Sequence, residues 1–138
     1  MVDDIDKKII NILSEDSTTS INDIAKVCKI SRGTVRLRIN KLKQEGIILG
    51  YNAIVKYQNV GMVESVLGLD IAPEYYMSAL DSLRKMDFVK HLYRTSGDHS
   101  AIAIVVAESI KIDNYIESIK NVKGIRNIYP AFVQDILK

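Results

Sequence analysis

Residues 20–46 read SINDIAKVCKISRGTVRLRINKLKQEG, and their pattern predicts the fold of the first part of the chain. Ser20 precedes apolar residues at helical spacing, and together with Asp23 it resembles a capping box. A short turn follows at residues 29–31, where Ser31 is placed to cap the next helix. The stretch therefore predicts two helices joined by a tight turn, which is a helix-turn-helix.

Apolar side chains recur on one side of each helix of this stretch. The expected inner faces are Ile21, Ile24, Ala25 and Cys28 in the first helix, and Val35, Ile39 and Leu42 in the second. Gly46 stands where a glycine commonly ends a helix. Upstream, Asp3 or Asp4 can cap another helix, which ends near Ser14 and has the inner face Ile5, Ile9, Ile12 and Leu13. The acids at its start complement the helix dipole.

Positive charge is concentrated around the second helix of the helix-turn-helix. Between Ile24 and Gln44 there are seven cations and no acid, although the whole chain has a net charge of only +2. The seven are Lys26, Lys29, Arg32, Arg36, Arg38, Lys41 and Lys43. A plain surface helix usually mixes both signs of charge. The pattern therefore indicates contact with the phosphate backbone of double-stranded DNA.

The composition is that of a globular protein. Of 138 residues, 47% are hydrophobic and 26% charged, and no apolar run approaches the length of a membrane span. The acidic start does not resemble a signal peptide, so we expect a cytoplasmic protein. The single cysteine, Cys28, excludes an internal disulfide framework, and its place on an inner helix face predicts a small core residue.

The residues after Gly46 read as extended. Ile47–Tyr51 are consistent with a short wing or with the start of a connecting strand that runs to Lys56. We expect a helix-turn-helix domain at 1–50, a connecting strand and linker at 51–61, and a second domain at 62–138.

The second half alternates between strand and helix patterns. Strands are expected at 62–72, 88–96, 99–107 and 125–134, and helices at 74–86 and 110–121, with Tyr76, Leu80 and Leu83 inside the first and Ile112, Ile116 and Ile119 inside the second. This βαββαβ order is that of a ferredoxin-like sandwich. The predicted fold class is therefore α+β, with an N-terminal three-helix domain.

The strand 99–107 is apolar on both faces. Its alternate residues are Ala101, Ala103 and Val105 on one side, and Ile102, Ile104 and Val106 on the other. Helices of such a sandwich cover only one face of the sheet, so we expect the sheet of a second copy to cover the other. Pro130 in the last strand predicts an edge position.

Four stretches resemble the leucine-responsive regulatory protein (Lrp/AsnC) family of bacterial and archaeal transcription regulators. They are residues 3–10 (DDIDKKII), 31–39 (SRGTVRLRI), Leu42 through 45–48 (EGII) to Gly50-Tyr51, and 95–98 (TSGD). The resemblance covers essentially the whole chain and its domain order. It implies a dimer or a higher even-numbered assembly (dimer, tetramer or octamer), built by the C-terminal domains. It also implies binding to palindromic promoter DNA and, in many members, an amino-acid effector near the loop between the second and third strands.

That loop departs from the family pattern. Family members commonly have Gly, an acid, an aromatic residue and Asp, whereas this chain has Gly97, Asp98, His99 and Ser100, which are its candidate effector-binding residues. The last strand, which often offers Thr or Ser to the same pocket, has Ile128 and Pro130 in those places. We therefore expect weak or no binding of common amino acids, with an unusual small ligand or constitutive DNA binding as alternatives. Asp98 reads equally well as a turn residue.

The candidate DNA-binding residues lie on the second helix of the helix-turn-helix. They are Ser31, Arg32, Gly33, Thr34, Arg36, Arg38, Asn40 and Lys43. Arginine can read guanine in the major groove, and the polar and cationic side chains can hold phosphates. Arg38 has a second interpretation, as a brace within the fold.

The sequence shows no arrangement typical of catalysis. There is no nucleophile–base pair, no glycine-rich phosphate loop and no pair of histidines at ligand spacing, so we expect neither an enzyme nor a metal or other cofactor. The resulting hypothesis is a sequence-specific DNA-binding transcription regulator. Its rivals are a ligand-binding module that acts by protein contact, and a small enzyme on the ferredoxin-like half.

Overall fold

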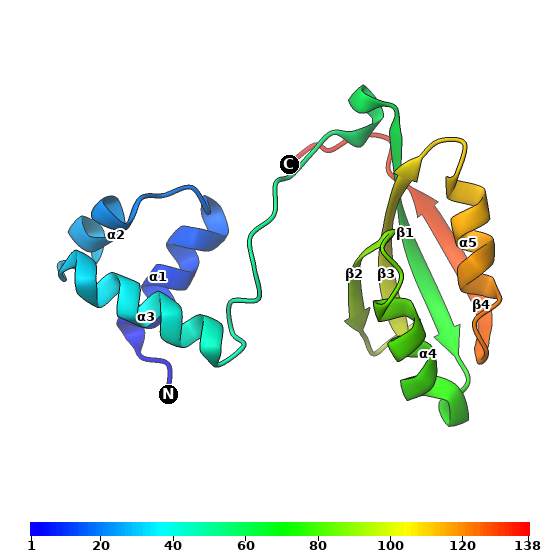
Figure 1. The fold of residues 1–138 in the computed structure, drawn as a ribbon, viewed down its shortest axis with the longest axis horizontal. Coiled ribbons are helices and arrows are strands. Elements are labelled where there is room, and N and C mark those ends of the chain that lie inside the picture. Colours follow the sequence, from blue (N-terminus) through cyan, green and yellow to red (C-terminus); the bar gives the residue numbers. More distant parts are fainter. The chain divides into compact units, whose positions relative to one another are not determined.

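The computed structural model describes all 138 residues. They form two compact units, Met1–Ile54 and Val55–Lys138 (Figure 1), and buried side chains give each unit its own hydrophobic core. None of the helices is long and apolar enough to cross a membrane.

The first unit consists of three helices, α1 (Asp4–Glu15), α2 (Ile21–Cys28) and α3 (Arg32–Gln44). Their buried side chains form one cluster made of Ile9, Leu13, Ile24, Ala25, Val35 and Ile39. The predicted helices and inner faces are confirmed, and Cys28 packs half-buried against this cluster.

Capping explains where these helices begin. The backbone N–H of Asp6 donates to the Asp3 carboxylate (2.8 Å), and the N–H of Asp3 donates to the Asp6 carboxylate (3.2 Å), which makes a complete capping box at α1. At α2 only one half is present, because Ser20 Oγ accepts from the Asp23 N–H (3.0 Å) without a reciprocal bond. The predicted capping box at Ser20 was therefore wrong in part, and the box stands at the first helix instead.

The segment after α3 differs from the prediction. Gly46 has φ +70° and follows the end of α3, as expected for a glycine in a helix-ending position. Residues 48–56, however, form neither the wing nor the strand that the sequence suggested. Within one chain they have no neighbouring strand to pair with, so their backbone stays irregular up to the short 3₁₀ turn η1 at Tyr57–Val60.

The second unit contains a four-stranded sheet and two helices. In chain order its elements are β1 (Met62–Ile71), the 3₁₀ turn η2 (Pro73–Tyr75), α4 (Tyr76–Arg84), β2 (Val89–Arg94), β3 (Ala101–Glu108), α5 (Ile112–Lys120) and β4 (Ile125–Phe132). The strand order is β2-β3-β1-β4, and all neighbours are antiparallel. The ferredoxin-like prediction is confirmed, and Pro130 lies in an edge strand.

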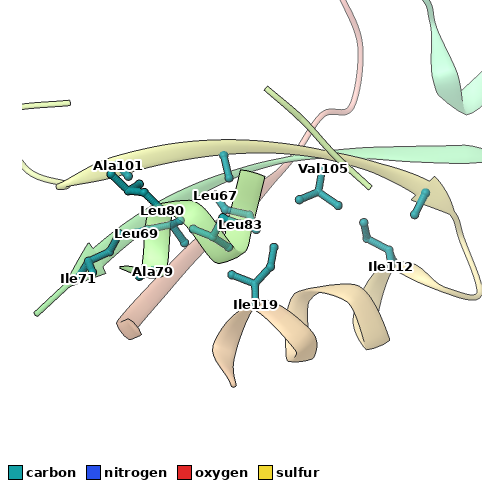
Figure 2. Close-up of a cluster of buried hydrophobic side chains, with 12 residues drawn as sticks. Leu67, Leu69, Ile71, Ala79, Leu80, Leu83, Ala101, Val105, Ile112 and Ile119 are labelled. Carbon is teal, nitrogen blue, oxygen red and sulfur yellow. The ribbon is translucent and has the colours of Figure 1, made fainter. Parts of the chain in front are cut away.

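Both helices cover the same face of the sheet. Leu80 and Leu83 from α4 and Ile112 and Ile119 from α5 pack on strand residues such as Leu67, Leu69, Ala103 and Val105 (Figure 2). The helix expected at 74–86 starts later, because Pro73 opens a 3₁₀ turn before α4 begins.

The other face of the sheet, called the outer face below, has no helix over it. Register places Ile104 opposite Val66, and Ile102 opposite Gly68, so that the side chains of Ile102, Ile104 and Val66 share this face. On the flanking strands Tyr93 and Tyr129 point the same way and are about half exposed (51% and 52%). The centre of the outer face is thus apolar and partly open, whereas Glu64 and Asp70 of β1 lie on the same face toward its ends.

Candidate nucleic-acid interface

The turn before α3 is fixed by backbone geometry and one capping serine. Lys29 ends α2 in the left-handed conformation (φ 57°). Ser31 Oγ then accepts from the Thr34 N–H (3.1 Å) and lies 2.8 Å from the Thr34 hydroxyl oxygen. Two of the predicted DNA contacts, Ser31 and Thr34, therefore also define the start of the helix. No acid lies in its first turn.

Apart from Lys41, an exposed cation on another side of the helix, the cations of α3 fall into two groups. Arg32, Arg36 and Lys43 are exposed and take part in no ion pair of the chain. Asn40 is exposed on the same side. Because residues four and seven apart share a helix face, this set forms one continuous polar strip along α3. We call these four residues the basic strip.

The basic strip borders a hollow within the first unit. Arg36, Asn40 and Lys43 line a space of about 370 Å³ together with the hydroxyl residues Ser17 and Thr19. Tyr51 forms part of its wall, with Lys43 Nζ 5.2 Å from the centre of the Tyr51 ring. Sequence analysis missed these three partners, which lie far from α3 in the chain or after its end. The lining also includes the apolar residues Leu13, Ile21, Ile24 and Ile39, so the cations and hydroxyls that border the hollow, rather than the hollow as a whole, suit phosphate oxygens.

Arg38 belongs to the second group, because it is bound within the unit. Its guanidinium Nη1 donates to the carboxylates of Asp3 (2.7 Å) and Asp6 (3.0 Å). Hydrogen bonding from Arg38, and then from the Asp6 N–H, holds the pKa of Asp3 below its ordinary value, and both carboxylates raise the pKa of Arg38. Of the two roles left open by the sequence, the structure places Arg38 in the brace that joins α3 to α1.

Leu37 lies between the two groups and was not among the predicted site residues. Its side chain is 72% exposed, although neighbouring apolar residues of α3 are buried. One turn earlier, a Cβ added to Gly33 would meet only Ser31 Oγ, at 3.9 Å, so the surface there is open. The apolar spacing of α3 places Val35, Ile39 and Leu42 on the inner face and leaves Leu37 off it, but the spacing gives an exposed leucine no role.

The four loop residues Gly97, Asp98, His99 and Ser100 are brought together around a second hollow. This hollow measures about 410 Å³ and lies between the β2–β3 loop and the ends of β1 and β4. Asp70, Arg126 and Asn127 also line it. These residues come from strands distant in the sequence, so only the sheet topology shows that they share a site with the loop.

Two of these loop residues, His99 and Ser100, already contact β1. Ser100 Oγ accepts from the Ile71 N–H (2.9 Å) and donates to the Leu69 carbonyl (3.1 Å). His99 Nδ1 lies 3.2 Å from the Asp70 carboxylate. The His99 ring covers Gly68 so closely that a Cβ there would approach it to 2.6 Å. The loop is thereby tied to the outer face of the sheet.

The prediction that Ile128 and Pro130 of the last strand face this hollow was wrong. Ile128 is paired with Leu69 and packs on the buried core, so its side chain faces the helices rather than the loop. Pro130, two residues on, does not line the hollow. Because side chains alternate along a strand, Asn127 faces the other way and joins Arg126 at the hollow. The site therefore holds one cation, which the sequence argument lacked.

Comparison with known proteins agrees with this architecture. A family described as winged helix-turn-helix DNA-binding matches residues 2–48. The chain is 34% identical to the HTH-type transcriptional regulator LrpA of Pyrococcus abyssi over 141 residues, with all of both chains covered. Among solved structures, AsnC of E. coli is 27% identical with a TM-score of 0.68, covering 100% of this chain and 95% of that one. A transcriptional regulator from Neisseria meningitidis, solved as an L-Met complex, has the same fold (17% identical, TM-score 0.72, 100% and 93% covered).

These findings define the class as a helix-turn-helix, DNA-binding transcription regulator. Within that class, the chain belongs to the leucine-responsive regulatory protein (Lrp/AsnC) family. Its relatives are regulators of transcription rather than enzymes.

Proposed function

We propose that this protein binds a palindromic promoter site in double-stranded DNA sequence-specifically, with α3 in the major groove. The observation that carries the proposal is the basic strip, which is exposed, free of acids and without ion-pair partners in the chain. A helix presenting such a face attracts the phosphate backbone and releases its counterions.

The residues of α3 have separate roles in this proposal. Arg32 and Arg36, near the start of the helix, reach base edges, where arginine pairs well with guanine. Asn40 and Lys43 hold phosphates beside the hollow with Tyr51. Ser31 and Thr34 offer hydroxyls at the helix start, and Gly33 lets the DNA approach closely. Arg38 acts as a positioning residue, because its guanidinium binds α1.

A second copy of the chain covers the outer face of the sheet in this proposal. Ile102, Ile104 and Val66 form an apolar surface there, which a monomer would leave partly in water. Burying it between two sheets yields a dimer, on which a tetramer or octamer can be built. A two-fold dimer carries two copies of α3, which matches a palindrome with half-sites about 34–36 Å apart.

The hollow at the β2–β3 loop is the proposed place for a small effector. Asp98 offers a carboxylate and Arg126 a guanidinium, so a small polar or zwitterionic molecule suits it better than an apolar one. The related fold from Neisseria, solved with L-Met, supports an amino acid as one class to test. Because Ser100 is used by the backbone of β1 and Asp70 by His99, only part of the lining remains for a ligand.

The rival function is a regulatory module that acts through protein contacts alone, with α3 serving only to pack the domain. A gel-shift titration of the full chain with random-sequence duplex DNA at low salt separates the two. The proposal predicts binding that weakens steeply as salt rises, whereas the rival predicts no shift. Selection of bound sequences from a random library then yields the preferred site, and a library that emerges unenriched contradicts sequence-specific binding.

A further inference from the structure

The side chain of Leu37 stands in the middle of the exposed side of α3. With about 100° between successive helical residues, it lies roughly opposite the buried Val35, Ile39 and Leu42. Its neighbours one turn away are Gly33, which has no side chain, and the exposed Lys41. It is 72% exposed.

A single leucine on a protein surface needs no explanation by itself. This one, however, lies between the basic strip on one side of α3 and, on the other side, Thr34 and Arg38, whose guanidinium binds α1. If the strip and the helix start contact the DNA backbone and base edges, the residue opposite the core faces the groove floor. The inference in this section rests on that proposed function.

The floor of the major groove offers one apolar group, the C5-methyl of thymine. Leu37 cannot donate or accept a hydrogen bond, so polar base edges and phosphates gain nothing from it. Gly33, with open space above its Cα, allows the helix to approach closely enough for van der Waals contact. We propose that Leu37 contacts a thymine methyl group in each half-site and thereby determines specificity at that base pair.

The test uses the sequence that the full-length protein selects from a random library. Each thymine of that duplex is replaced singly by uracil, which removes only the C5-methyl. Binding is measured by fluorescence anisotropy at fixed salt. Loss of one buried methyl corresponds to about 0.8 kcal/mol, or about a fourfold weaker binding per half-site. We expect this loss at one position of each half-site and little change at the other thymines.

Three variants assign the effect to the side chain. Leu37→Ala should bind the thymine and uracil duplexes equally at that position, and alanine at an exposed helical site keeps α3 folded. Leu37→Met, which stays apolar and of similar volume, should retain the preference for thymine. Leu137→Ala removes the same atoms from a leucine that is 92% exposed in the other unit, and should behave as wild type.

The outcomes separate the inference from the function on which it rests. Wild type that selects a sequence yet ignores uracil at every position overturns the inference and leaves the proposed function standing. The same holds if Leu37→Ala keeps the thymine preference. Wild type that selects no sequence overturns both.

Discussion

The chain leaves two surfaces uncovered, and their chemistry differs. On α3 the basic strip of Arg32, Arg36, Asn40 and Lys43 is polar and cationic. On the sheet the centre of the outer face is apolar, with Ile102 and Ile104 partly exposed. A cationic strip is stable in water alone and gains most from a polyanion, whereas an apolar sheet face gains from being removed from water. We therefore propose DNA as the partner of the first surface and a second copy of the chain as the partner of the second.

The largest expected effect comes from charging the apolar surface. Ile104→Asp places a carboxylate in the centre of the outer face, where a second sheet would strip it of water. We expect the dissociation constant of the dimer to rise at least about a hundredfold, which corresponds to about 2.7 kcal/mol. Sedimentation velocity at micromolar concentration measures it, with Ile110→Asp, at a residue 83% exposed before α5, as the matched control. If the wild-type protein sediments as a monomer, no second copy covers the outer face.

The next effect concerns the basic strip. Arg36→Ala should weaken DNA binding by about 1–3 kcal/mol and relax the preference at one base pair if Arg36 reads a base. If it holds a phosphate, affinity should fall on all sequences and the salt slope should decrease by about one unit. Anisotropy titrations on selected and random duplexes distinguish the two. A folded variant that binds DNA as tightly as the wild type would show that the basic strip does not contact DNA through Arg36.

Arg38 differs from the basic strip, because it lies on the same helix but binds the carboxylates of Asp3 and Asp6 at α1. Arg38→Met leaves the buried Asp6 carboxylate without its cation, which costs about 1–2 kcal/mol because the Asp3 N–H still donates to it. Urea unfolding of the full chain followed by circular dichroism measures the loss. Lys41→Met, which removes an exposed cation outside any ion pair, is the control.

The same brace predicts a dependence on pH. Arg38 lowers the pKa of Asp3 in the folded state, so its contribution is present above the ordinary aspartate pKa and is lost as pH falls through the folded value. The stability difference between wild type and Arg38→Met should therefore shrink in acid. A difference that stays constant down to full protonation of Asp3 would mean that the charge pair stabilises nothing.

The smallest expected effect is at the loop hollow. Since Ser100 and Asp70 are already engaged, we expect the twenty amino acids at millimolar concentration to stabilise the protein by less than about 1 kcal/mol, against about 2.7 kcal/mol for a ligand at a hundred times its Kd. Thermal-shift screening measures this. A large shift with any one of them that disappears in Asp98→Ala would show that the altered loop still holds an ordinary amino acid.

Much of the fold could be predicted from the sequence because its signals are local. Apolar spacing and capping residues fix α1 to α3, and alternation with Pro130 at an edge fixes the sheet. The failures are non-local. Residues 48–56 read as extended, yet a strand needs a partner that one chain does not supply. The capping box at Asp3 uses the same acids that bind Arg38, and a carboxylate pattern alone does not reveal this double use.

The candidate sites divide in the same way. The basic strip follows from helical spacing, whereas the hollows depend on residues that only the tertiary fold assembles. Arg126 lines the same hollow as the β2–β3 loop because β4 pairs with β1. Tyr51 lines the same hollow as α3 because the chain turns back after Gly46. Helical periodicity leaves Leu37 off the inner face of α3, but it does not show what an exposed leucine contacts.

Whether α3 recognises a DNA sequence is decided by the ratio of the affinities for the library-selected duplex and for a random duplex, each titrated over a range of salt. We expect a ratio of about a thousandfold or more at physiological salt. We also expect log affinity to fall linearly with log salt for both duplexes. Equal affinity for the two duplexes, or binding insensitive to salt, would contradict sequence-specific recognition of DNA by α3.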